Sequence, residues 1–504
     1  MKTLIKDRRS NIIITSIVLV LALLIGILTS IKFIQFRNYE AQFVLREDVI
    51  DEVIKFSEYS PHIKGDVADS NIYKIVGSEN TVAVVKNNTE LDTLDKMKNA
   101  NVCAVTGTSQ LEVANAVFSG IEEVAEENIA FTKLKNGNSD VVVIAYKDAK
   151  AFVKANEGYK ISDVEIEKVP SVLVMGGTHP NEPSGQVTAT LFLENALVER
   201  GILYVITELN RSAYSYSQPQ EATTWYYHLK TASGKERLFK YGSRATNTVD
   251  QWPTPDVYTH SSGQQLSSSE VRNINRAYPG SENGTYTEQI AWAITNFVNQ
   301  NDVTIVIDLH EASPEYLTIN ACVYHQDAEE IVNKSRSRYF RYKDENGDNA
   351  RMEISFDQSP VSMHGLTHRE LGDYTNAYVF LFETSNASQG KLRGAFTEDL
   401  ITYSKKDKFY EAAVAYDEKN GTELIYGRPV SINERVARHT LSIVSVIEGF
   451  NKIGVTRTVS VTGRNNVGEG GVTVGEFKFK DGSIPAYSDI VSNGAGYYLL
   501  DVGE

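Results

Sequence analysis

The amino-acid sequence predicts an α/β protein whose main domain is a largely buried sheet flanked by helices. Between Val169 and Phe450, short apolar runs typical of strands alternate with amphipathic segments typical of helices. Runs such as Ala377–Phe382 are apolar throughout, which is expected of strands covered on both faces. The chain has 504 residues, of which 41% are hydrophobic and 23% are charged. This length and balance predict several globular domains.

The charge balance and the cysteine content exclude some classes of function. The formal net charge is −15, which argues against a nucleic-acid partner, because phosphate binding needs a concentrated basic face. The two cysteines of the sequence, Cys103 and Cys322, fall in different predicted domains. Neither a disulfide framework nor a cysteine zinc site is therefore expected. We expect both thiols to be buried as small hydrophobic groups.

The N-terminal segment, residues 1–35, predicts a transmembrane signal anchor. Ile12–Ile31 carries no charged side chain and is long enough to cross about 30 Å of hydrocarbon as a helix. Four basic residues precede it, which predicts a cytoplasmic N-terminus and an exported remainder. A cleaved signal peptide is the alternative, but no small-residue cleavage site follows the apolar run. We expect a single-pass protein of the cell membrane with an extracytoplasmic catalytic domain.

Two segments precede the main domain in this prediction. Residues 36–75 are charged and mixed, as in a stalk or linker, and residues 76–165 predict a small α/β lobe. The lobe, in "ELDTLDKMKNANVCAVTGTSQLEVANAVF" and "LKNGNSDVVVIAYKDAKAFVKAN", resembles one lobe of the periplasmic amino-acid-binding proteins. In that family the helix after such a Gly-Thr turn helps to hold the carboxylate of the ligand. Because a full binding protein needs two lobes, we expect a structural or docking module, with ligand binding as the alternative.

The main domain is assigned to residues 169–450. Its expected strands are Ser171–Met175, Gly201–Thr207, Thr304–Leu309 and Ala377–Phe382, and its expected helices are Ser184–Arg200, Tyr286–Asn299 and Glu434–Glu448. Residues 455–504 are Gly-rich and alternate between apolar and polar side chains. This pattern predicts a small C-terminal β domain.

Three side chains in the main domain are candidate metal ligands. His179 and Glu182 stand three residues apart on the Gly-rich turn of "GGTHPNEPSG", and His310 ends the strand-like run in "TIVIDLHEAS". Hydrolytic zinc sites take three protein ligands and leave one position for water, and sites on α/β sheets gather at strand ends. Asp308 is a candidate to orient the ring of His310. Taken singly, residues of this kind are more often ordinary loop or core residues.

Two further motifs carry side chains suited to amide hydrolysis. "RNINRAYPG" contains Asn275 and Arg276, and arginine suits two-point binding of a carboxylate. "YVFLFETSN" ends an apolar strand with Glu383, a carboxylate that can take a proton from an attacking water. An isolated arginine in a turn or a glutamate at a strand end would carry no such meaning.

Together, these motifs resemble the zinc carboxypeptidase superfamily, and more closely its succinylglutamate desuccinylase/aspartoacylase branch. The resemblance spans about Val169 to Phe450 and implies a zinc-carboxypeptidase-like mixed sheet flanked by helices. It also implies a zinc metallohydrolase with one Zn²⁺ ion. By the resemblance, the zinc ligands are His179, Glu182 and His310, the general base and proton donor is Glu383, and the groups that hold a substrate carboxylate are Asn275 and Arg276.

Other polar residues are weaker candidates for this site. In the family an additional arginine polarises the scissile carbonyl, and Arg211 in "TELNRSAYS" is the nearest candidate, although its surroundings depart from the usual asparagine-proline spacing. In "SMHGLTHRELGD" we expect a loop near the active site, with His368 or Arg369 touching the substrate. Local hydrogen bonding is the alternative for that loop. Lys391 and Arg393 are further possible anion contacts.

The sequence thus predicts an extracytoplasmic zinc-dependent hydrolase that cleaves an amide bond near a substrate carboxylate. The local motifs favour a deacylase of N-acyl amino acids, whereas the expected location outside the cell favours a carboxypeptidase acting on peptides or cell-wall fragments. The alternative is a solute-binding or cell-surface interaction protein with an inactive hydrolase domain. The occupied catalytic positions argue against that alternative.

Overall fold

The main domain is built on a mixed sheet whose strands come from distant parts of the chain. The computed structural model describes residues 72–216, 226–339, 342–343, 349–350, 352–391, 393, 396–402, 408–423, 425, 430–454, 477–478 and 485–501. The strands of the sheet are β1 (Ile72–Val76), β7 (Ser171–Met175), β9 (Ile202–Ile206), β14 (Ile305–Ala312), β15 (Ala321–Tyr324), β18 (Ser355–Gln358) and β19 (Tyr378–Ser385). Their spatial order is β1-β9-β7-β14-β19-β15-β18.

The centre of this sheet is parallel and its outer strands are mixed. Strands β9, β7, β14 and β19 run parallel, whereas β1 and β15 run antiparallel to their inner neighbours. β7 and β14 are buried along their whole length, because helices cover both faces of the sheet. The main domain therefore has the mixed, helix-flanked α/β architecture that the sequence predicts.

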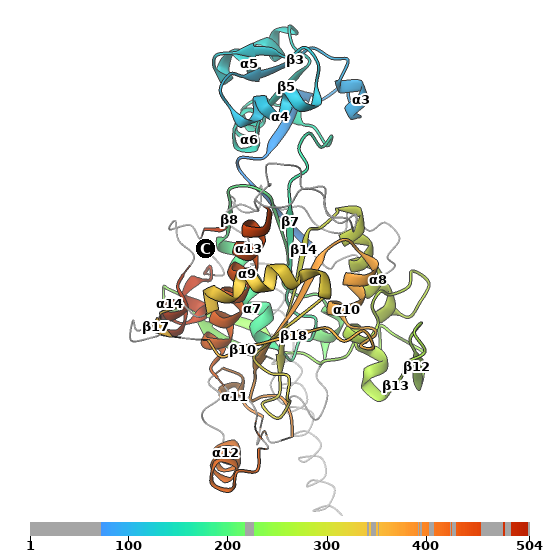
Figure 1. Ribbon diagram of the computed structural model, residues 1–504, viewed down its shortest axis with the longest axis vertical. Helices are drawn as coiled ribbons and strands as arrows, with labels where there is room; N and C mark the ends of the chain where they lie inside the picture. Colours follow the sequence, from blue (N-terminus) through green and yellow to red (C-terminus); the bar gives the residue numbers. More distant parts are fainter. Residues whose placement is uncertain are drawn as a thin grey trace, which may run out of the picture. The chain divides into compact units, whose positions relative to one another are not determined.

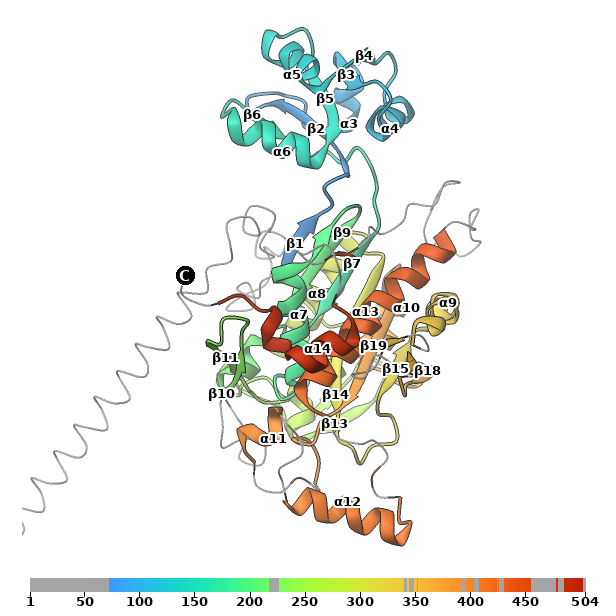
Figure 2. The same ribbon diagram turned by 90° about the vertical axis from the view of Figure 1, so that its left-hand side faces the viewer.

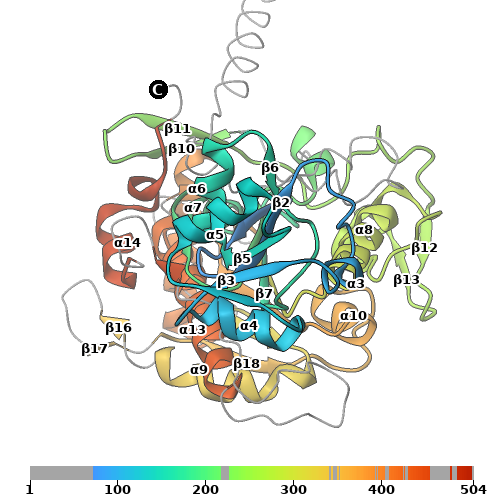
Figure 3. The ribbon, with the colours of Figure 1, turned by 90° about the horizontal axis from the view of Figure 1, so that it is seen from above.

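Two pairs of helices cover the two faces of the sheet (Figures 1 and 3). On one face lie α8 (Tyr286–Gln300) and α10 (Thr367–Tyr374), whose apolar side chains join the core around β7, β9 and β14. On the other face lie α7 (Pro183–Asn195) and α13 (Ile432–Gly454), which contact each other as well as the sheet. α9 (Glu329–Tyr339) packs against α13. Helix α7 is thus enclosed by the sheet and α13, which explains why its small and apolar residues are not confined to one stripe.

Smaller elements complete the main domain. They are β8 (Leu197–Val198), β10 (Tyr226–Lys230), β11 (Glu236–Lys240), β12 (Val257–Thr259), β13 (Gln265–Ser267), β16 (Tyr342–Lys343), β17 (Asn349–Ala350), β20 (Phe477–Lys478), α11 (Glu398–Thr402) and α12 (Lys408–Asn420). β10 pairs with β11 and β12 with β13 as antiparallel hairpins. Both hairpins belong to the long connection between β9 and α8 that also carries site residues.

The small lobe has a sheet and a core of its own. Its elements are β2 (Thr81–Lys86), α3 (Leu94–Met97), β3 (Val102–Val105), α4 (Ser109–Val117), β4 (Glu122–Val124), α5 (Glu127–Asn136), β5 (Val141–Ala145), α6 (Tyr146–Ala155) and β6 (Tyr159–Ile161). The five strands pair in the order β4-β3-β5-β2-β6. One apolar cluster lies on each side of this sheet, centred on Val143 and on Val142 respectively. Alternating residues of one strand therefore feed two separate cores.

The lobe is inserted into the main domain rather than preceding it. Strand β1 lies before the lobe in the sequence, yet it pairs with β9 of the main sheet (Figure 2). The segment predicted as a stalk, 36–75, thus ends in a strand of the main domain. The rest of that stalk and the predicted anchor, including 12–31, lie outside the described residues. Among the described residues, none of the helices combines the length and the apolar character needed to cross a membrane.

In the C-terminal segment, 477–478 form the short strand β20, whereas 485–501 differ from the expected β domain. Residues 487–493 form helix α14, and 495–498 form a short 3-10 helix. Asp489 accepts a hydrogen bond from the backbone N–H of Ala486, which caps the start of α14, and Gly494 ends it at a φ of +93°. The Gly-rich alternation was therefore misleading here, because a capped helix start followed by a glycine stop predicts a short helix. Most of 455–484 lies outside the described residues.

Candidate metal centre

The predicted metal ligands meet at the carboxyl ends of β7 and β14. His179 and Glu182 lie on the turn between β7 and α7, and His310 lies near the end of β14. All three are buried, and their ligand atoms lie within 4.8 Å of one another. His179 Nδ1 is 2.8 Å from Glu182 Oε1, and His310 Nδ1 is 2.9 Å from Glu182 Oε2. The structure thus brings together a His–Glu–His group that can hold a metal ion.

The glycines of "GGTHPNEPSG" allow this turn to pack closely against its neighbours. Gly177 has a φ of +72°, and a Cβ there would lie 2.6 Å from the Tyr214 hydroxyl. A Cβ on Gly185 would lie 2.7 Å from the carbonyl oxygen of Leu309, the residue before the ligand His310. Larger side chains would therefore separate the turn and α7 from β14, and with them the three ligands.

Both histidines are held through the ring nitrogen that faces away from Glu182. His179 Nε2 lies 2.8 Å from Asn273 Oδ1, and His310 Nε2 lies 2.9 Å from Asp308 Oδ2. Asp308 in turn accepts hydrogen bonds from Thr178 at 2.7 Å and Thr367 at 2.6 Å. Metal-binding histidines typically have such a partner on the second nitrogen, because it fixes the orientation of the ring. The role expected for Asp308 fits this arrangement.

The electrostatics of the group favour positive charge between the ligands. Burial by itself would lower the pKa of His310, but Asp308 and Glu182 raise it well above its ordinary value. Burial would raise the pKa of Glu182, but His179 and His310 lower it. Without a metal, the two carboxylates therefore favour the protonated form of His310. A divalent cation would satisfy the same carboxylates.

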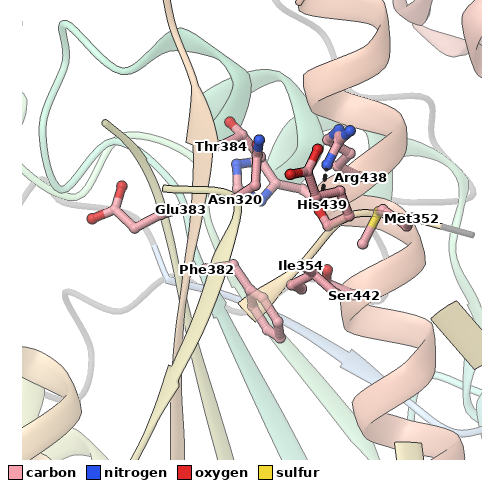
Figure 4. Close-up of a pocket in the computed structure, with 10 residues that line it drawn as sticks. Asn320, Met352, Ile354, Phe382, Glu383, Thr384, Arg438, His439 and Ser442 are labelled. Atoms are coloured by element: carbon pink, nitrogen blue, oxygen red, sulfur yellow. Dashed lines mark hydrogen bonds between the residues drawn. The ribbon is translucent and has the colours of Figure 1, made fainter. Parts of the chain in front are cut away.

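Glu383 lies beside this group on the neighbouring strand. It is in register with His310 across the parallel pair β14 and β19, so both side chains leave the same face of the sheet. In Figure 4 the side chain of Glu383 points away from the pocket residues on the other side of β19, such as Phe382 and Thr384. Burial, and then the negative charge of Glu182, raise the pKa of Glu383 to about 8. A carboxyl group in this range can both accept and return a proton near neutral pH.

An arginine that the sequence analysis did not single out lies against the metal ligands. Arg244 Nη1 is 3.3 Å from Glu182 Oε1 and also 3.3 Å from His179 Nδ1. The predicted candidate, Arg211, is instead 41% exposed, and its Nε lies 3.9 Å from Glu208 Oε2. The structure therefore does not bring Arg211 to the ligand group and puts Arg244 there. Arg244 lies in a long connection of mixed composition, and no local motif marks it.

Arg276 lies close to Arg244, and one carboxylate joins them. Glu270 Oε1 is 3.2 Å from Arg244 Nε, and Glu270 Oε2 is 3.4 Å from Arg276 Nε. Burial, and then the positive charge of Arg244, lower the pKa of Arg276. The two guanidinium groups thus repel each other, and Glu270 is the carboxylate that contacts both. This arrangement favours the binding of a further anion.

Asn275, the second residue predicted to hold a substrate carboxylate, has hydrogen-bond partners inside the protein. Asn275 is buried, and its Oδ1 accepts hydrogen bonds from the N–H and the hydroxyl of Thr367 at 2.8 and 2.9 Å. It thereby supports Thr367, and through Thr367 it supports Asp308. Asn273, two residues earlier, is the asparagine that contacts a metal ligand. The pattern "NIN" contains both, and the sequence alone does not distinguish them.

His368 and Arg369, at the start of α10, have different partners. His368 is buried, its Nδ1 lies 2.7 Å from Ser359 Oγ, and burial followed by the charge of His310 lowers its pKa to about 3. It is therefore a neutral ring close to the ligand group. Arg369 is fully buried and donates from Nε to Asp373 Oδ2 at 2.7 Å, so its guanidinium is committed to an internal ion pair. The predicted loop ends at Leu366, where α10 begins.

The other weak candidates, Arg393 and Lys391, contact residues other than the metal ligands. Arg393 donates to the carbonyl oxygen of Ser388 at 3.1 Å and stacks over Phe396. The backbone N–H of Lys391 donates to Glu315. Cys103 and Cys322 are both free and buried, as expected.

The fold and the site define a mixed α/β protein with a buried candidate metal centre at the strand ends. No protein-family model matches the sequence, and no curated protein matches it. Among solved structures, product-bound Csd4, a cell shape determinant protein from Helicobacter pylori, is 13% identical, with 55% of this chain and 50% of that chain covered and a TM-score of 0.31. A succinylglutamate desuccinylase from a Silicibacter species is 13% identical, with 52% and 59% covered and a TM-score of 0.27.

A third similarity is of another kind. The substrate-binding protein of an amino acid ABC transporter is 28% identical, with 17% of this chain and 40% of that chain covered and a TM-score of 0.17. The chain thus spans about two fifths of the length of this binding protein, and 50% and 59% of the other two. All three similarities are partial, so we base the function on the geometry of the site.

Proposed function

We propose that the protein is a zinc-dependent hydrolase that cleaves an amide bond near a substrate carboxylate. The observation that carries this proposal is the His–Glu–His group together with Glu383, which is in register with the ligand His310. A metal site alone would be equally consistent with a structural ion. A carboxylate with a pKa of about 8 beside it gives the site a group for proton transfer.

The donor set fits zinc. Two imidazole nitrogens and one carboxylate are a common ligand set of hydrolytic zinc sites, which leave a coordination position open. Zinc held in this way polarises a carbonyl group and makes water a nucleophile near neutral pH. The partners of the second ring nitrogens, Asn273 and Asp308, support this assignment because they fix both rings for ligation.

The residues around the ligands support a division of labour. Glu383 would take a proton from the attacking water and return it to the leaving amine. Arg244, next to two of the ligand atoms, would stabilise the negative charge that develops on the carbonyl oxygen. It takes the role that the sequence suggested for Arg211.

Arg276 supports the assignment of a carboxylate near the scissile bond. Its Nε is paired with Glu270, and its Nη1 donates to the carbonyl oxygen of Asn275 at 2.6 Å. A substrate carboxylate bound by Arg276 would also compensate the repulsion between Arg276 and Arg244. The positive charge of Arg276 is one of the causes that lower the pKa of His368. We propose that the neutral ring of His368 contributes to the same subsite.

The cellular setting remains part of the proposal. Residues 12–31 would anchor the protein in the membrane, with the hydrolase domain outside the cell. Protease treatment of intact cells tests this orientation, because an external domain is digested without lysis. Protection of the domain until the cells are lysed would refute it.

The activity itself is tested with the full chain purified in detergent. Bound metal is quantified, and hydrolysis is measured on N-acyl amino acids and on peptides with free C-termini, each with and without a chelator. We expect about one zinc per chain and activity that the chelator removes and zinc restores. A protein that binds no divalent metal, or that binds zinc and hydrolyses neither class, would contradict the proposal.

A further inference from the structure

The residue after the ligand His310 faces the opposite side of the sheet. Side chains alternate along β14, so Glu311 points toward α7 and α13 while His310 points toward the site. Glu311 Oε1 lies 3.0 Å from Arg435 Nη1 of α13, and both side chains are 0% exposed. A fully buried ion pair therefore lies on the opposite face of the sheet from the metal centre.

The carboxylate of Glu311 contacts α13 and the segment after β19. Its Oε2 accepts a hydrogen bond from Asn386 Nδ2 at 2.8 Å, just beyond the end of β19. Burial raises its pKa, and this effect is opposed first by Arg435 and then by Ser184. Ser184 belongs to the first turn of α7, the helix whose N-cap is the ligand Glu182. The side chain of Glu311 is thus held by α13 and by the segment after β19.

The backbone of Glu311 touches a metal ligand directly. Its N–H donates to Glu182 Oε2 at 3.0 Å, and this is the same oxygen that lies 2.9 Å from His310 Nδ1. Any displacement of Glu311 would therefore move the hydrogen bond that orients the Glu182 carboxylate. Partners of this kind set the direction in which a ligand presents its lone pairs.

Helix α13 also borders strand β19, at His439. His439 lies one turn after Arg435 and is fully buried, and burial lowers its pKa to about 3. Figure 4 shows His439 among the residues that line a pocket beside β19. Helix α13 therefore adjoins β14 at Arg435 and β19 at His439.

We infer that Glu311 and Arg435 form a positioning pair that holds the metal ligand Glu182 in place from behind the sheet. This inference rests on the proposed metal centre. A buried ion pair is in general a poor source of stability, because dehydration of the two charges offsets their attraction. Its location one residue from His310, with its backbone on Glu182, gives it a role in the geometry of the site instead.

The test compares this pair with a matched buried pair at the end of α7 opposite to the ligand Glu182. Arg237 and Glu194 are 2% and 1% exposed and lie 2.6 Å apart between β11 and α7. The variants are Glu311→Gln and, as control, Glu194→Gln, each in the full chain. Zinc affinity is measured by competition with a chromophoric chelator, and the ligand field by the visible spectrum of the cobalt-substituted protein. Because Glu311→Gln leaves Arg435 unpaired, Glu311→Gln/Arg435→Met is measured as well.

We expect both Glu311 variants to bind zinc about 10- to 100-fold more weakly and to show an altered cobalt spectrum. Glu194→Gln should lower the thermal midpoint yet leave zinc affinity and spectrum as in the wild type. Wild-type affinity and spectrum in the Glu311 variants would overturn the positioning role alone, as would an equal loss in Glu194→Gln. A wild-type protein that binds no zinc would overturn the metal centre itself and the inference with it.

Discussion

His310 and Glu383 are paired residues on the adjacent parallel strands β14 and β19. Because paired residues on parallel strands project from the same face, the metal ligand and the proposed base are held by the sheet itself and not by a mobile loop. The turn with His179 and Glu182 follows β7, the strand on the other side of β14. The proposed reaction centre is therefore set by three neighbouring strands.

The first prediction concerns the base. Glu383→Gln should retain zinc and lose about 10²- to 10⁴-fold in kcat, because the amide is nearly isosteric but cannot accept the proton. Metal content and steady-state kinetics measure the two effects separately. Glu398→Gln, on the short helix α11, serves as the control and should behave as wild type. Normal turnover by Glu383→Gln would show that another group is the base.

The second prediction separates two arginines. Arg244→Ala should lower kcat by about 10²- to 10³-fold, as expected for loss of a group that stabilises the oxyanion. Arg211→Ala should stay close to wild type, because Arg211 is exposed and lies beside Glu208. Kinetics of the two variants on one substrate decide between them. A large effect at Arg211 and none at Arg244 would restore the assignment made from the sequence.

The third prediction concerns substrate binding. Arg276→Ala should raise KM by roughly 30-fold for substrates with a free carboxylate, which corresponds to about 2 kcal/mol for a lost charge-assisted hydrogen bond. Substrates whose carboxylate is amidated should be hydrolysed equally by wild type and variant. Arg276→Lys should recover little, since a lysine cannot form the paired contacts. Equal losses on both kinds of substrate would argue against a carboxylate subsite at Arg276.

The fourth prediction concerns the pH dependence of metal binding. The pKa of His310 is raised in the metal-free protein, so His310 is protonated at neutral pH and must lose that proton to bind a metal. Zinc affinity should therefore rise with pH until the raised pKa is passed, and binding should release protons. Calorimetry in buffers of different ionisation enthalpy measures the release. Zinc binding without proton release at pH 7 would contradict it.

The raised pKa of His310 also makes the thermal midpoint of the protein depend on pH. The direction of this dependence is opposite for the metal-free and the zinc-bound protein. A raised folded-state pKa stabilises the metal-free fold at pH values below about 6.5, the unfolded value, and this contribution is lost as pH rises through the folded-state pKa. The thermal midpoint of the metal-free protein should therefore fall toward alkaline pH. With zinc bound, the midpoint should rise over the same range, since the metal replaces the proton.

The architecture could largely be predicted from apolar runs and turn residues. The strands around 171–175, 304–309 and 377–382 are short, apolar and bounded by polar residues. Their ends can therefore be predicted from the sequence, and the candidate ligands stand at those ends. β1 could not be identified in this way. It is a short edge strand separated from its partner β9 by the whole lobe, and only tertiary pairing reveals it.

The site was predicted where local spacing carries the information and missed where it does not. His179 and Glu182 share one turn, and His310 and Glu383 end apolar strands, so each can be read from its neighbours in the sequence. Arg244 contacts the ligands and Glu270 contacts Arg244. Both lie in the long connection between β9 and α8, whose path no periodicity encodes. Asn273 was missed because its neighbour in the "NIN" pattern was equally plausible.

The two connections between the lobe and the main sheet both begin beside the start of strand β9. Val76, the last residue of β1, and Ser171, the first of β7, both pair with Ile202 of β9. The two exits are therefore about 10 Å apart, twice the usual spacing between strands. A few residues would bridge that gap, so a direct connection from 76 to 171 should give a smaller protein that still forms the main sheet.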